Sequence, residues 1–436
     1  MKPRRSSEAP LPRSPLDFVY PLTIRAPGAE GGAILAEVRD RYALAVLRAL
    51  RLVLAWSRGP DLAAPLFRRE PLDEWEAELH AARIRKPLRM PLIALAAELR
   101  RPERADPGVL AQACFAISEW ALGTGAESTA LLFAEAAALV SPTDARRAWI
   151  VGRMLRNAGR LREGELWLRR AARVAVWCAD WETQDLALNS LGNLYLQQGS
   201  LKEALRYLVR ALKLARRFSM KEREAAVSHD LFPVYVLTGD HSRAEKTAIR
   251  TFDLYGPHHP NLPKLAHDVV QLWLRQGRFP LALPVLRALL PCLRLPHERL
   301  RVLAATVRAA GACRDSLAYE EAWAEAWDLV QHPSPEVRSV LPAVLVDLGF
   351  GAGSLSNWER AAEALRLALQ TANERGAYED AAQAELGLEM VQRYERIETP
   401  LRALTGPAAD LSDAFVRSLE SAMSPDQKTR SGGPRR

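Results

Sequence analysis

Apolar residues recur along most of this chain at the spacing of amphipathic helices, and glycines interrupt them at regular intervals. The clearest segment begins at Asp185. There, apolar and small residues at fixed offsets predict two amphipathic helices joined by a turn at a glycine. The residues that carry this pattern are Leu188, Leu191, Gly192, Tyr195, Gly199, Ala204, Leu208 and Ala211. Ala204 and Ala211 fall on the second helix, where small side chains allow close packing against the first.

The same pattern returns at steps of about 34 to 45 residues, so the chain is predicted to be a repeat array. A generic helical bundle would share the helical period but not glycine and alanine at fixed offsets. The Leu303 unit is the weakest, and it predicts a longer turn after Gly311. A closing helix is expected near residues 379–397. The other units are marked by Ile117 with Ala130, Gly152 with Leu168, Leu231 with Ala244, Val269 with Ala282, and Leu348 with Leu365.

In residue type and spacing these positions resemble the tetratricopeptide repeat (TPR). The resemblance implies an all-α fold, a right-handed superhelical solenoid of antiparallel helix pairs, over residues 111–397. The long spacing is similar to that of the repeat variant found in peptide-sensing regulators and cargo adaptors. The resemblance therefore implies a protein- or peptide-binding scaffold or adaptor that uses a concave groove.

Four segments lie outside the predicted array. Residues 1–30 and 424–436 are rich in Pro, Ser, Gly and basic residues and are expected to be disordered tails. Residues 31–102 are helical without the repeat, with one long helix predicted from Ile34 to Leu50. This region either caps the array or, as the alternative, carries the output of a transcriptional or signalling regulator. Residues 398–423 are predicted to be a C-terminal capping segment.

The composition predicts the cellular location and makes some classes of partner unlikely. No apolar run reaches the roughly 18 residues that a membrane span requires, so no membrane insertion is expected and the cytoplasm is the predicted location. The net charge of +8 lies partly in the two tails, and nucleic acid is an unlikely partner. The four cysteines lack the spacing of zinc ligands and are predicted to be buried free thiols: Cys114, Cys178, Cys292 and Cys313.

We find no sequence motif of a catalytic site or of a phosphate-binding loop, so no enzymatic activity and no cofactor are expected. Two doublets, His229–Asp230 and His267–Asp268, occupy equivalent positions of adjacent repeats. Neighbouring helices would place them side by side, where they could bind a metal. The alternative, that the aspartates make hydrogen bonds between helices, is favoured, and no metal site is predicted.

The resemblance also implies which residues line the concave groove, namely positions 2, 5, 9, 12 and 13 of each first helix. Cations outnumber acids at these positions, with Glu119 and Glu298 as the acids. Guanidinium and amide groups bind carboxylates and peptide main chain, so an acidic or carboxylate-bearing segment is the predicted partner. The predicted peptide-binding residues are Arg146, Trp149, Arg153, Arg156, Asn157, Asn189, Asn193, Gln197, His229, Lys264, His267, Gln271, Arg275, Arg301 and Arg308.

Overall fold

The structure is a computed structural model, in which the described residues are 34–38, 42–59, 73–75, 77, 79, 86–395, 397–398 and 406–423. These residues form α-helices and short 3-10 turns, and none of them lies in a β-strand. The predicted all-α fold of paired helices is confirmed. The chain divides into two compact units, residues 1–223 (unit 1) and residues 224–436 (unit 2). The predicted tails, residues 1–30 and 424–436, lie outside the described residues.

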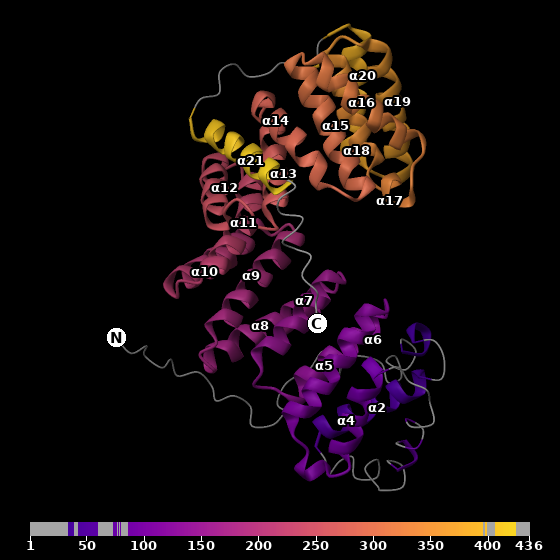
Figure 1. Cartoon of the computed structure of the whole chain (residues 1–436), viewed down its shortest axis with the longest axis vertical. Helices are drawn as coiled ribbons and strands as arrows, with labels where there is room; N and C mark the ends of the chain where they lie inside the picture. The colour runs from indigo at the N-terminus through magenta and orange to yellow at the C-terminus, as the bar shows by residue number, and fades with distance from the viewer. Residues whose placement is uncertain are drawn as a thin grey trace. The chain divides into compact units, whose positions relative to one another are not determined.

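Unit 1 consists of consecutive helices, each in contact with the next from α4 to α10 (Figure 1). Three pairs, α5–α6, α7–α8 and α9–α10, carry the repeat pattern that the sequence predicts. The elements of the unit are α2 (Ala43–Ser57), α4 (Lys86–Leu99), η4 (Pro102–Arg104), α5 (Pro107–Gly123), α6 (Glu127–Val140), α7 (Ala145–Asn157), α8 (Leu161–Trp177), α9 (Trp181–Gln197) and α10 (Leu201–Arg217).

Unit 2 contains the remaining predicted helix pairs, and its first residue, Glu224, lies in the first turn of α11. The predicted pairs are α11–α12, α13–α14, α15–α16 and α18–α19, and α20 is the predicted closing helix. The elements are α11 (Lys221–Leu237), α12 (His241–Tyr255), α13 (Leu262–Arg275), α14 (Phe279–Leu289), η5 (Leu290–Cys292), α15 (Pro296–Cys313), α16 (Ser316–Gln331), α17 (Pro335–Arg338), α18 (Leu341–Ser354), α19 (Trp358–Arg375), α20 (Tyr378–Gln392) and α21 (Pro407–Met423).

The repeat spacing has a backbone cause. Within the five pairs from α5 to α14, a glycine with positive φ ends the first helix: Gly125, Gly159, Gly199, Gly239 and Gly277. Glycine adopts this left-handed conformation without steric cost, so the chain can turn within a few residues. Small residues then lie where the two helices meet. Ala204 is fully buried, and a Cβ on Gly192 would lie within 3 Å of the Leu208 side chain, as the predicted register requires.

The α15–α16 pair departs from the sequence-based prediction. The turn is not longer; instead α15 runs on past Gly311 to Cys313, and Arg314 adopts the positive φ that glycine supplies elsewhere. Gly311 has a different role within the helix. A Cβ at this position would lie 2.8 Å from the Cα of Gly351 on α18, so the two backbones cross in close contact.

The N-terminal helices pack onto the first repeat, α2 against α6 and α4 against α5. The predicted long helix from Ile34 is interrupted: residues 34–37 are helical, Val38 is a bend, and α2 begins at Ala43. The Glu37 carboxylate accepts hydrogen bonds from the backbone N–H groups of Ser128 (2.9 Å) and Thr129 (2.7 Å). These N–H groups lie in the first turn of α6 and have no partner within the helix, so Glu37 caps α6.

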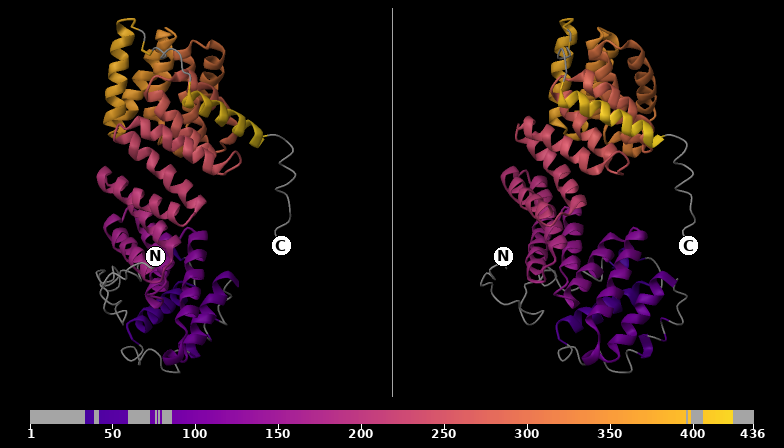
Figure 2. Two further views of the ribbon diagram at one scale, coloured as in Figure 1. Left: turned by 90° about the vertical axis from the view of Figure 1, so that its left-hand side faces the viewer. Right: turned by 60° about the vertical axis from the view of Figure 1, so that its left-hand side comes forward.

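The last helix, α21, packs on α14 and also contacts α12 and α13 within unit 2 (Figure 2). Phe415 is fully buried there, edge-on to Phe252 at 5.1 Å between ring centroids. The Ser412 hydroxyl donates to the backbone carbonyl of Leu281 at 2.9 Å. α21 thus covers apolar surface of α12–α14, whereas the sequence placed this segment over the end of the array.

Candidate functional site

The candidate site in unit 1 is formed by two neighbouring first helices, α7 and α9, which contact each other directly. We call it the α7–α9 surface. Trp149 lies at its centre, and two guanidiniums contact its ring, Arg146 at 4.6 Å and Arg153 at 4.8 Å from the centroid. The Trp149 Nε1–H donates to the Ser190 hydroxyl of α9 at 2.9 Å. The surface is defined by Arg146, Trp149, Arg153, Asn189, Asn193 and Gln197.

Electrostatically, the α7–α9 surface is cationic with amides beside it. Arg153 is exposed, and Arg146 makes only a solvent-exposed ion pair at 3.5 Å with Glu182, which contributes little. Cation–π contacts hold both guanidiniums over the indole, with a gain of roughly 0.5–1 kcal/mol each at exposed positions. These contacts favour rotamers that place both guanidiniums beside the indole.

The remaining predicted residues of unit 1 extend this surface toward the helix ends. Arg156 donates from Nη2 to the Asn157 side-chain oxygen at 3.0 Å, and Asn157 and Gln197 are exposed at the ends of α7 and α9. Asn193 is half-buried. Three predicted residues are buried instead of exposed: Trp149 is 7% exposed, Asn189 9%, and His229 of unit 2 6%. Trp149 and Asn189 thus form the floor of the surface.

In unit 2 the histidines of both doublets lie beside the carboxylate of Asp268. The His229 Nε2 is 3.1 Å from the Asp268 carboxylate of α13, and its Nδ1 is 3.0 Å from the Tyr255 hydroxyl. His267, half-buried, is 3.5 Å from the same carboxylate. Burial alone would raise the pKa of Asp268, but hydrogen bonds from the two histidines lower it to about 2. Asp268 therefore links α11 to α13, as the favoured interpretation of the doublets requires.

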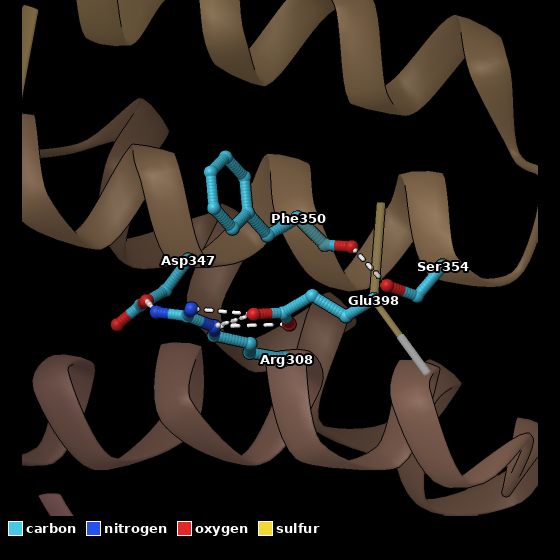
Figure 3. A network of polar contacts seen from close by, with 5 residues as sticks. All are labelled: Arg308, Asp347, Phe350, Ser354 and Glu398. Atoms are coloured by element: carbon cyan, nitrogen blue, oxygen red, sulfur yellow. Dashed lines mark hydrogen bonds and ion pairs between the residues drawn. The ribbon is translucent and has the colours of Figure 1, made fainter. Parts of the chain in front are cut away.

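The strongest charge cluster of unit 2 surrounds Arg308 of α15 (Figure 3). Its guanidinium donates to Asp347 of α18 at 2.7 Å and to both carboxylate oxygens of Glu398 at 3.0 Å. The guanidinium also lies 5.1 Å from the centroid of the Phe350 ring. Burial would lower the pKa of Arg308, but the two carboxylates raise it well above its usual range. Arg308, a predicted groove cation, is thus already bound to two acids.

The other predicted cations of unit 2 remain accessible. Arg275 lines a pocket of about 330 Å³ that also includes Arg308 and Glu398. Lys264, Arg275 and Arg301 are exposed, and none of them forms an ion pair with an acid among the described residues. Gln271 is half-buried on α13, between Lys264 and Arg275.

Sequence reasoning did not find Glu398, Tyr255 or Ser190. Ser190 and Tyr255 belong to the repeats but contact predicted residues 41 and 26 positions away, and no local pattern marks such contacts. Glu398 follows α20 and lies outside every repeat. A single acid in a segment without periodicity carries no signal of its own.

The four cysteines differ in their exposure. Cys114 is buried, and burial raises the pKa of its thiol to about 12. Cys292 and Cys313 are half-buried, but Cys178 is exposed, against the prediction, because it follows the last turn of α8. No group of three or more His, Cys, Asp and Glu side chains suited to a metal ion occurs within the described ranges.

Among the helices that the structure describes, none is both long enough and apolar enough to cross a bilayer.

Comparison with known proteins agrees with this geometry. The family model of the tetratricopeptide repeat matches residues 185–218, the segment of α9 and α10, so this helix pair is a tetratricopeptide repeat. Such repeats stack into scaffolds for protein interactions. The repeat therefore places the protein in the class of protein-interaction scaffolds. No curated protein matches the sequence.

Three solved structures illustrate the range of similarity. A Rap protein complexed with competence and sporulation factor is 11% identical, with a TM-score of 0.39, over 81% of this chain and 98% of that chain. Aspartyl phosphate phosphatase F from Bacillus subtilis is 11% identical, with a TM-score of 0.41, over 88% and 99%. The P58(IPK) TPR domain is 14% identical, with a TM-score of 0.22, over 88% and 99%. These values carry no inference about function.

Proposed function

We propose that this protein is a scaffold or adaptor that holds an extended, acidic segment of a partner protein against the first helices of its repeats. The observation that carries the proposal is the α7–α9 surface. Two arginines that contact one tryptophan ring present a cationic area, and the amides of Asn193 and Gln197 lie on the adjacent helix. Guanidiniums bind carboxylates, while side-chain amides bind the peptide main chain.

Unit 2 supports the same chemistry independently. Lys264, Arg275 and Arg301 are on first helices, are exposed, and lack an ion-pair partner among the described residues. An unpaired surface cation costs the folded protein little and attracts acidic partners over distances of about 10 Å at ordinary ionic strength. The two units thus each offer cations to an acidic segment.

The N-terminal region favours a scaffold over a regulator with a separate output. α2 and α4 use their apolar faces against α6 and α5, and Glu37 caps α6. Both interactions cover an end of the array that would otherwise expose apolar surface, which is the role of a terminal cap in repeat proteins. We therefore interpret the described part of residues 31–102 as a cap.

The proposal is tested by affinity capture from the native cell with a triple variant, Arg153→Ala, Asn193→Ala and Gln197→Ala. These side chains are exposed or half-buried, so each change should alter the free energy of unfolding by no more than about 0.5 kcal/mol. A matched control replaces three exposed residues of α10: Lys202→Ala, Arg206→Ala and Lys213→Ala. Specific partners should be lost with the first variant and retained with the second. Equal capture by both, with normal helicity, would overturn the proposal.

A further inference from the structure

Two residues beyond the closing helix lie against the first helices of unit 2. Ile397 packs beside α18 at Gly353, where a Cβ would lie 2.9 Å from the Ile397 Cγ1. Glu398 places its carboxylate against the guanidinium of Arg308 on α15 (Figure 3). An apolar side chain and the carboxylate that follows it are thus held by two different helices of the array.

This pair of contacts has the form of a bound ligand. Arg308 is one of the positions predicted to contact a partner, and it binds both oxygens of one carboxylate, the geometry in which guanidinium recognises acids. The absence of a side chain at Gly353 leaves the room that Ile397 fills. The segment that supplies both residues is not part of a repeat.

We propose that Arg308 and Gly353 form a receptor for a peptide that presents an apolar residue followed by a carboxylate, and that Ile397–Glu398 occupies this receptor until a partner displaces it. The inference rests on the proposed function and adds to it the ligand class and a built-in competitor. The partner is a protein segment whose apolar–acidic pair matches that of Ile397 and Glu398.

Exchange of one carboxylate for another is energetically reasonable at this site. Arg308 keeps Asp347 throughout, so the half-buried guanidinium is never left unpaired. Desolvation opposes the half-buried Glu398 carboxylate and raises its pKa despite the attraction of Arg308. Release of Glu398 to water removes this desolvation cost, so a partner with further contacts can displace the internal carboxylate.

The pocket beside Glu398 supplies such contacts. It is lined by the turn between α13 and α14, and it brings the exposed Arg275 to the same opening as Arg308. A partner that extends beyond the apolar–acidic pair can place a second carboxylate against Arg275, which the internal segment leaves without an acid among the described residues. A longer acidic segment should therefore compete best.

The test uses a fluorescein-labelled peptide that copies residues 393–400, titrated by fluorescence anisotropy against the full-length chain. Glu398→Ala removes the internal carboxylate and leaves Arg308 in place. A tethered competitor has an effective concentration in the millimolar range, so the variant should bind the peptide about tenfold more tightly than the unmodified chain. Glu395→Ala, which removes an exposed carboxylate of the same segment, is the matched control and should leave the affinity unchanged.

Two further measurements assign the binding to this receptor. A peptide with Gln at the position of Glu398 should lose at least tenfold in affinity for the Glu398→Ala chain. Gly353→Ala, added to Glu398→Ala, fills the place of the apolar side chain without changing any charge, and should also weaken binding. It also leaves Arg308 and its ion pair with Asp347 in place, so the test does not depend on replacing that guanidinium.

The inference is wrong if the Glu398→Ala chain binds the peptide no better than the unmodified chain, if it does not bind at millimolar peptide, or if the Gln peptide binds equally well. Failure here is distinguishable from failure of the proposed function. The scaffold proposal survives if variants of the α7–α9 surface still lose their partner while this peptide does not bind.

Discussion

The crossing of α15 and α18 allows a sharp prediction about what holds unit 2 together. Gly311 and Gly351 face each other, and a Cβ on Gly311 would lie 2.8 Å from both the Cα and the carbonyl carbon of Gly351. Carbon atoms pack at about 3.5–4.0 Å, so Gly311→Ala forces the two helices apart by roughly 0.7 Å or more. The obstacle is backbone, which cannot rotate away as a flexible side chain can.

The magnitude follows from two opposing effects. A gap of this size forfeits roughly a quarter to a half of the attraction between the atoms that face it, and overpacking of this kind costs about 1–3 kcal/mol. Alanine gains up to about 1 kcal/mol over glycine in a helix interior. Gly123→Ala isolates that gain, since Gly123 ends α5 with no atom of another residue within 4 Å of a built Cβ. The effects of Gly311→Ala and Gly123→Ala on the free energy of unfolding should therefore differ by about 1–3 kcal/mol.

Hydrogen exchange followed by mass spectrometry is the appropriate assay, because repeat arrays open locally and this method reports the protection of each helix separately. Amides of α15 and α18 should exchange faster in Gly311→Ala than in the unmodified chain, by the factor that corresponds to the overpacking cost less the alanine gain measured on α5 in Gly123→Ala; in Gly311→Ala, α5–α8 should be unaffected. Unchanged protection in α15 and α18 would refute the close crossing of the two backbones.

Three other predictions follow. Ala204→Leu should destabilise α9 and α10 by roughly 1–3 kcal/mol, because Ala204 is fully buried at the helix contact; an unaltered urea midpoint would show that the register is wrong. Glu37→Ala removes the cap of α6 and should cost about 1–2 kcal/mol, seen as faster hydrogen exchange in α2 and α6 and contradicted by unchanged rates. The pKa of Asp268 is lowered to about 2, so its ionised carboxylate stabilises the fold above about pH 4 and this contribution is lost as the pH falls toward 2. Asp268→Asn should therefore be less stable than the unmodified chain in urea at pH 6, with the difference shrinking by pH 3; a difference independent of pH would contradict this.

The sequence predicts the helix pairs well where a glycine must take positive φ. Gly199 and Gly239 both end a first helix at the predicted place, because no other residue adopts this conformation as readily. The predicted end of a helix is wrong where a residue other than glycine adopts the positive φ. Arg314 has φ 60°, and nothing in its residue type marks it as a turn residue, so the helix end was placed too early, at Gly311.

The candidate site is predictable to a smaller extent for a different reason. The position of a residue within the repeat predicts the direction of its side chain. It does not predict which other residues bury or pair with that side chain. Trp149 is a predicted groove residue, yet Ser190 of the next repeat and two arginines of its own helix bury it. Arg308 is paired by Glu398, 90 positions away and outside the repeats. Such contacts depend on tertiary structure, which a local pattern does not contain.

The central claim, that a partner lies along the first helices of the array, is tested most directly by photocrosslinking in the native cell. A photoreactive amino acid replaces Gln197 of α9 or Arg153 of α7 in one pair of chains, and Lys213 of α10 in a third; all three side chains are exposed. The claim predicts a specific crosslinked partner from positions 197 and 153 and none from position 213. Crosslinks of equal yield from position 213, or their absence from both positions of the α7–α9 surface while the partner is still captured, would contradict it.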